Sequence, residues 1–171
     1  MRGSRRLSII LVVILLVACT VDESGQPTLP APITLTPPAA ITVQGTCDEN
    51  STLERWLQTT SLALSDFIVT MNSTAAQERA GMSDSIYRLA ALRDAVIAAA
   101  APDCGIGVQE RMVDAMNTVV TTLQGYFNGD LPNLGSTIGD ASALLDRVIA
   151  EQNELIVRLE TQINQQNNNG Q

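Results

Sequence analysis

The chain has 171 residues, with 18 acidic and ten basic side chains and no histidine, so its formal net charge at pH 7 is −8. Without histidine the chain lacks the commonest general base and the commonest metal ligand, which argues against most enzyme chemistries. The acidic excess argues against nucleic acid as a partner, because the surface would repel phosphates. We therefore expect a noncatalytic protein with no cofactor and no metal site.

The first 18 residues have the layout of a secretion signal. Three arginines within the first six residues precede an unbroken apolar run from Ile9 to Ala18. That order is typical of an export signal peptide. The run is about half as long as a bilayer-spanning helix, which favours a signal peptide over a transmembrane anchor.

The signal ends in the tetrapeptide LVAC, at residues 16–19. This ending resembles the lipobox of bacterial lipoproteins. The resemblance implies that residues 1–18 are removed as a lipoprotein signal peptide and that the Cys19 sulfur receives a diacylglycerol. Acyl chains such as palmitate on Cys19 would then anchor the protein in the membrane. The alternative is an ordinary signal peptide that contains an inert, buried cysteine.

Residues 19–46 are expected to form the lipid anchor and an extended linker. Five of the seven prolines lie between residues 20 and 46, among threonines and alanines that show no helical period. A Pro/Thr-rich stretch of this kind favours a partly polyproline-like spacer. The spacer would lift the rest of the protein off the membrane surface.

Four stretches after the linker have the apolar period of an amphipathic helix. They lie near residues 51–72, from residue 82 to Pro102, at 107–128 and at 137–166. The first begins with a sequence, Ser51–Glu54, that fits a capping box. On the outer face of the last stretch, Arg147 is expected to pair with Glu151 and Glu154 with Arg158. Its inward face is predicted to carry Ile138, Ala141, Leu145, Val148, Ile156, Leu159 and Ile163, together with the polar Gln152.

Short turns between these stretches predict an all-α, up-down-up-down four-helix bundle over residues 47–166, followed by a disordered tail at 167–171. In that topology Cys47 and Cys104 lie at the same end of the bundle, so we expect them to form a disulfide. Because the linker enters at Cys47, the disulfide end is predicted to face the membrane. The turns near Asn72 and Asn128 would then point away from the membrane and meet a partner first.

Four methionines on the inward faces, Met71, Met82, Met112 and Met116, are candidates to line an apolar pocket between the helices. Methionine adapts to apolar ligands of irregular shape, and plain core filling is the alternative reading. We expect an envelope-anchored lipoprotein that acts as a binding or scaffolding module for another envelope protein. A carrier or sensor of a small apolar ligand is the second hypothesis, and self-association is the third. The anchor predicts the cell membrane or the outer membrane as the location, facing the periplasm or the exterior.

Overall fold

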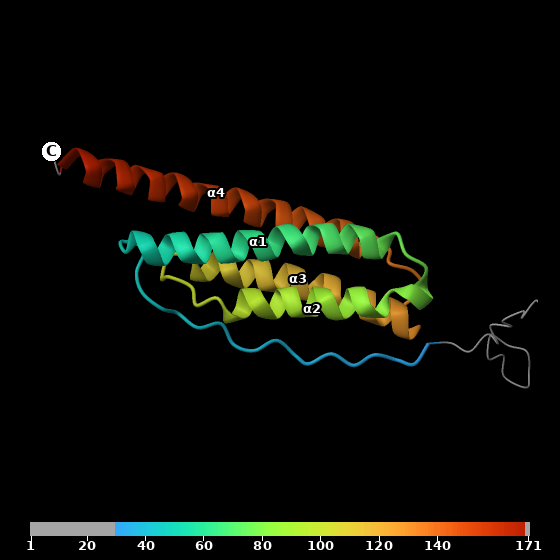
Figure 1. Ribbon diagram of the computed structural model, residues 1–171. Helices are drawn as coiled ribbons and strands as arrows, with labels where there is room; N and C mark the ends of the chain where they lie inside the picture. The colour runs from blue at the N-terminus through green and yellow to red at the C-terminus, as the bar shows by residue number, and fades with distance from the viewer. Residues whose placement is uncertain (1–29, 170–171) are drawn as a thin grey trace, which may run out of the picture.

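The computed structural model describes residues 30–169, which form a bundle of four α-helices. The helices are α1 (Asn50–Ala75), α2 (Ser83–Ala98), α3 (Ile106–Asn128) and α4 (Thr137–Asn169), and a 3-10 turn, η1 (Arg79–Gly81), precedes α2. Consecutive helices run in opposite directions (Figure 1). The prediction of an all-α, up-down-up-down four-helix bundle is confirmed. The predicted signal peptide and Cys19 lie outside the described residues.

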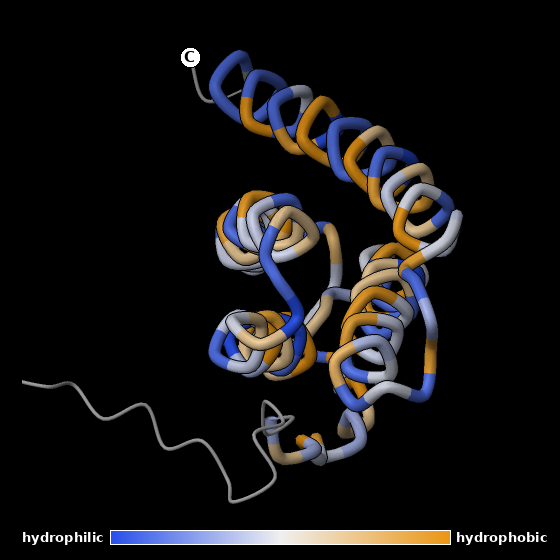
Figure 2. The backbone as a smooth tube through the Cα atoms, turned by 90° about the vertical axis from the view of Figure 1, so that its right-hand side faces the viewer, coloured by the Kyte–Doolittle hydropathy of each residue, from blue (hydrophilic) through white to orange (hydrophobic). Residues whose placement is uncertain are grey.

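One continuous apolar core runs along the bundle axis. On α1, residues at steps of three and four are buried, among them Leu53, Leu57, Leu64 and Phe67. Figure 2 looks along the bundle and shows apolar residues gathered where the helices face one another. Burying one apolar stripe on each helix is the main stabilisation of such a fold, since isolated helices of this length are marginal in water.

The helix ends follow local chemistry. Gly129 ends α3 in the left-handed conformation, with φ at +88°, which costs glycine little because it has no Cβ. Pro102 follows α2 closely, where its missing N–H prevents the helix from continuing. The predicted capping box on α1 is wrong. The helix begins at Asn50 without a side-chain cap, and the Thr52 hydroxyl donates to the Glu49 carboxylate instead.

Residues 30–46, called the strap below, lie extended along α2 and α3 (Figure 1). At its start, the Ile33 N–H donates to Asn128 Oδ1 at 2.9 Å, and Gln124 and Asn128 each donate to the Ile33 carbonyl at 3.0 Å. The side chain of Ile33 is buried in the core. Residues 30–46 are extended, but they are docked on the bundle, with Ile33 held by α3, where a spacer that lifts the bundle off the membrane was expected.

The middle and end of the strap are also held. Arg93 of α2 is 2% exposed and donates to the Thr36 carbonyl at 3.1 Å and to Asn117 Oδ1 at 2.7 Å. Further along, Ala101 donates to the Thr42 carbonyl and accepts from Gln44 N–H, as in a two-residue parallel bridge. The strap thus runs the length of the bundle and delivers the chain to α1.

This course removes the premise of the predicted orientation, which had the chain enter the bundle at the disulfide end. The strap starts beside Asn128, at the C-terminal end of α3, and ends at Cys47 at the opposite end (Figure 1). A tether attached to residue 30 therefore begins at the Asn128 end.

Cys47 and Cys104 lie at disulfide-bonding distance, with their Cα atoms 5.9 Å apart. The Asp103 carboxylate accepts from the backbone N–H groups of both cysteines, at 3.0 Å and 2.7 Å. Cys47 is buried, whereas Cys104 is half-buried. The bridge joins the end of the strap to the connection between α2 and α3, as the sequence predicts.

Helix α4 differs from its prediction in three respects. It continues to Asn169, so residues 167–169 are helical where a disordered tail is expected. Glu151 pairs with Arg111 of α3 and Arg158 with Asp48, so neither makes the predicted pair along α4. Ile156 is only half-buried and Ile163 is 37% exposed, although both are predicted to face inward. Within residues 30–169, no helix has both the length and the apolar character required to cross a bilayer.

Loss of the Cys47–Cys104 bridge is expected to lower the free energy of unfolding by about 4 kcal/mol, because 57 positions separate the cysteines and opening the loop returns entropy to the unfolded chain. Urea unfolding followed by circular dichroism, with and without reductant, measures the change. A Cys47→Ser, Cys104→Ser double variant is the control, and its stability should not respond to reductant. Equal midpoints for the oxidised and reduced chain would contradict the prediction.

The substitution Asn128→Ala is expected to loosen the start of the strap, because it removes the acceptor of the Ile33 N–H and one donor to the Ile33 carbonyl. Hydrogen exchange measured by mass spectrometry should become faster at residues 33–36 and stay unchanged in α1. Asn133→Ala, at an exposed position in the next turn, is the matched control. Unchanged exchange at Ile33 would mean that the strap is held by other contacts.

Candidate functional site

The four methionines singled out from the sequence are all part of the core. Met71 is 1% exposed, and Met82, Met112 and Met116 are fully buried. The clefts described below are lined by other residues. This placement favours core packing over a methionine-lined ligand pocket.

Cys47, Asp103 and Cys104 form a cluster whose donor atoms could hold a metal by distance alone. Their chemistry does not fit a metal site, because the two sulfurs are placed to bond each other and the carboxylate already accepts two backbone N–H groups. The cluster is better explained as the disulfide and hydrogen bonds that hold the end of the strap against the connection between α2 and α3.

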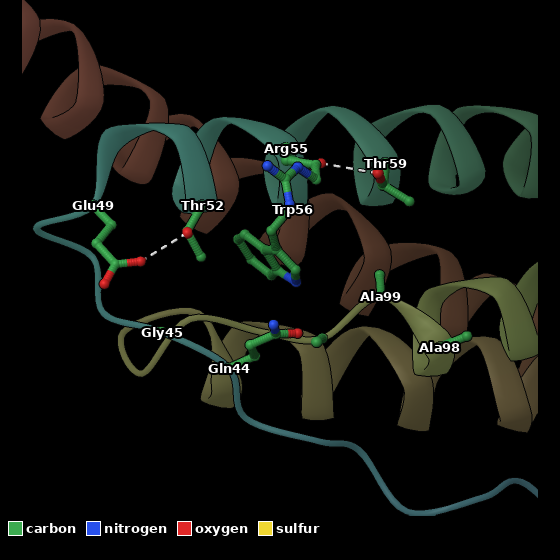
Figure 3. Close-up of a pocket in the computed structure, with 10 residues that line it drawn as sticks. Gln44, Gly45, Glu49, Thr52, Arg55, Trp56, Thr59, Ala98 and Ala99 are labelled. Atoms are coloured by element: carbon green, nitrogen blue, oxygen red, sulfur yellow. Dashed lines mark hydrogen bonds between the residues drawn. The ribbon is translucent and has the colours of Figure 1, made fainter.

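A cleft of about 320 Å³ opens between the strap, the start of α1 and the end of α2 (Figure 3). Figure 3 shows Trp56 reaching from α1 toward Gln44 of the strap, with Glu49 and Thr52 at one side. Glu49 and Arg55, the charged residues that line the cleft, are both exposed. The cleft therefore offers solvated charges and no buried group that a reaction could use.

A buried polar network lies behind this cleft. The Trp56 indole N–H donates to Gln109 Oε1 at 2.7 Å, and Gln109 Nε2 donates to the carbonyls of Val96 and Ala99 at the end of α2. Gln109 is fully buried, so its polar atoms have lost their hydrogen bonds to water. The bonds to Trp56, Val96 and Ala99 replace them. A Cβ at Gly105 would lie 3.1 Å from the Trp56 ring, which explains why a glycine precedes α3. The network ties α3 to both α1 and α2.

A second surface feature, called the α1/α4 groove below, consists of two adjoining clefts of about 410 and 310 Å³. Both clefts include Ser61 of α1 and Ile156 of α4, which makes the groove continuous. Its lining is mainly apolar and comprises Leu57, Leu64, Ile68, Val69, Ile149, Ile156 and Leu159, with Glu54, Gln58, Ser61, Ser65, Gln152 and Asn153 between them.

The groove exists because α4 is inclined to the other helices. In the view along the bundle, α4, which ends at the marked C-terminus, is drawn at a slant (Figure 2). At its far end α4 is tied to the start of α1 through polar side chains, with Asn50 donating to Gln166 and Gln162 donating to the Cys47 carbonyl. Deep in the groove, Gln152 donates to the Thr60 hydroxyl at 2.8 Å. Hydrogen bonds between polar side chains thus connect α4 to α1 at positions where a closely packed apolar interface would be expected.

Large apolar side chains stay in water at this face. Val69, which lines the groove, is 67% exposed, and Leu62, seven residues earlier on the same side of α1, is 65% exposed. An exposed apolar surface that extends along a groove is typical of an interaction site. Sequence reasoning missed this site, although one signal was present. The apolar face of α4 is wider than a bundle core requires, because Ile149, Ile156 and Ile163 form a further stripe beside it.

No protein-family model matches the chain, and neither a curated protein nor a solved structure matches it.

Replacement of Gln109 by leucine is expected to lower the free energy of unfolding by about 2–4 kcal/mol, because the Trp56 N–H and the carbonyl of Ala99 lose their buried partner. The double variant Trp56→Phe, Gln109→Leu should lose less than the sum of the two single variants, since both the donor and its acceptor are then gone. Urea unfolding measures both quantities. Gln58→Leu, at an exposed position of α1, is the control. Strict additivity of the two substitutions would contradict a coupled network.

Proposed function

We propose that the mature chain is a lipid-anchored, noncatalytic binding module of the bacterial envelope, which contacts another envelope protein through the α1/α4 groove. The observation that carries the proposal is the contrast between a closed core and an open apolar groove. The methionines fill the interior, whereas Leu62 and Val69 remain in water beside the groove. A surface of this kind favours a protein partner over a small ligand held inside the bundle.

The proposed anchor is the Cys19 lipid, and the proposed location is the cell membrane or the outer membrane, facing the periplasm or the exterior. Ten residues, 20–29, separate Cys19 from the strap and reach at most about 35 Å. Since the strap begins at the Asn128 end, this tether supports an upright bundle with its disulfide end outward. The α1/α4 groove then runs along the side of the bundle, within reach of a partner in the same membrane or in the space beyond it.

A photo-crosslinking amino acid at Val69, in cells that express the full chain, tests the partner. We expect a discrete protein adduct from Val69, because this residue lines the groove and is 67% exposed. Tyr87, which is 48% exposed on α2, is the matched position on another face and should give no adduct. No protein adduct from Val69, or the same adducts from both positions, would refute the proposed surface.

The same cells provide the test of the anchor. Labelled palmitate should enter the wild-type chain and not a Cys19→Ser variant, because the cysteine sulfur begins the proposed lipid modification. Equal labelling of the two chains would exclude Cys19 as the anchor.

A further inference from the structure

The α1/α4 groove has an edge of one charge sign on α4. Three isoleucines, Ile149, Ile156 and Ile163, recur every seven residues along the helix, and Asp146, Asn153 and Glu160 recur with the same spacing three residues earlier. Residues three and four apart are neighbours on a helix surface, so the polar stripe runs directly beside the isoleucine stripe. Asp146, Asn153 and Glu160 are all exposed. The outer edge of the groove on α4 is therefore acidic and hydrophilic.

On the α1 side, one further acidic residue and no basic residue from the described part of the chain lines the groove. Glu54 lines the groove near the start of α1, and Ser61 and Ser65 follow it. No arginine lines either cleft of the groove among the described residues. Several arginines are engaged elsewhere: Arg93 holds the strap, Arg79 stacks on Tyr126, Arg111 pairs with Glu151 and Arg158 pairs with Asp48. Asp146 and Glu160 thus have no arginine partner within residues 30–169.

The length of the groove suits a helix. Along α1 it extends from Glu54 to Val69, which at 1.5 Å per residue corresponds to roughly 22 Å, or about four helical turns. An amphipathic helix places apolar side chains at steps of three, four and seven residues, and such a helix binds an apolar groove by inserting them. The apolar floor of the α1/α4 groove, bordered by Ile149 and Ile156 on one side and Ile68 and Val69 on the other, matches this mode.

A second copy of this chain is a poor occupant. Without its first 18 residues the chain has seven arginines and 18 acids, a formal charge of −11, so two acidic edges would be forced together. A partner whose apolar face is flanked by lysine or arginine would instead pair with Glu54, Asp146 and Glu160. We propose, building on the binding function above, that the α1/α4 groove binds a basic amphipathic helix of another protein.

The test uses the full-length chain in nanodiscs of zwitterionic lipid, with empty nanodiscs subtracted to remove binding to lipid. The probe is a fluorescent 18-residue synthetic helix of leucine and lysine, and the comparison helix has glutamate at every lysine position. Fluorescence anisotropy at low salt should give an affinity at least roughly tenfold higher for the lysine helix, because complementary charges favour docking and like charges oppose it. Raising the ionic strength should reduce this difference.

Two variants locate the binding. The double substitution Asp146→Asn, Glu160→Gln removes the edge charges. It should lower the affinity for the lysine helix by about three- to tenfold, as expected for the loss of two solvated ion pairs. Glu110→Gln with Asp114→Asn removes two exposed charges from α3 and is the matched control, which should leave the affinity unchanged. Val69→Ser should weaken the binding of both helices by removing an apolar contact at the border of the groove. Because Val69 is 67% exposed, the substitution should not disturb folding.

Each outcome decides the proposal. Equal affinities for the two helices, no binding of either, or equal weakening by the α3 control would overturn it. Groove-dependent self-association of the nanodisc-embedded chain would also overturn it in favour of a second copy. A null result with the lysine helix, together with a protein adduct at Val69 in cells, would reject the basic helix and leave the binding function standing.

Discussion

The side chain of Asn128 holds the backbone of Ile33 from both sides, accepting its N–H and donating to its carbonyl. This contact joins residues 95 positions apart in the chain and fixes the start of the strap at the C-terminal end of α3. At the other end, the Cys47–Cys104 bridge fixes the strap to the connection between α2 and α3. Because both ends are held, the strap covers one side of the bundle and leaves the opposite α1/α4 side open.

Three buried polar groups join the helices to one another. Gln109 connects α3 to α1 and α2, Gln152 connects α4 to α1, and Arg93 connects α2 to α3 and the strap. An apolar core alone tolerates small shifts between helices, whereas a shift here would leave a buried donor without its acceptor. These bonds therefore specify the register of the bundle more sharply than leucine and methionine packing does. The Gln152–Thr60 bond lies under the α1/α4 groove and helps to set how far apart those helices stand.

The α1/α4 groove is the consequence of that arrangement. Val69 and Leu62 remain largely in water, and the half-buried Ile156 lies between the two clefts. Leaving such side chains in water forgoes stabilisation of roughly 25 cal/mol for each Å² of apolar surface, which a partner helix would recover. In the proposed binding mode, the acids along the edge would disfavour pairing between two copies of this acidic chain. In that binding mode, affinity and selectivity for a basic helix would arise from different residues of the same surface.

The helical period of the apolar residues, at steps of three and four, and the short turns were enough to predict four helices, their alternating directions and the meeting of Cys47 with Cys104. These features depend on local period and short connections. The resemblance of residues 16–19 to a lipobox is likewise read from the sequence alone. Only the tertiary structure decided the course of the strap, since no local pattern indicates that Asn128 and Gln124 would bind the Ile33 backbone. It also decided that Glu151 pairs with Arg111 of α3 and that Ile163 is partly exposed. Both outcomes depend on how α4 inclines against its neighbours, and that angle is set by packing and by hydrogen bonds between residues far apart in the chain.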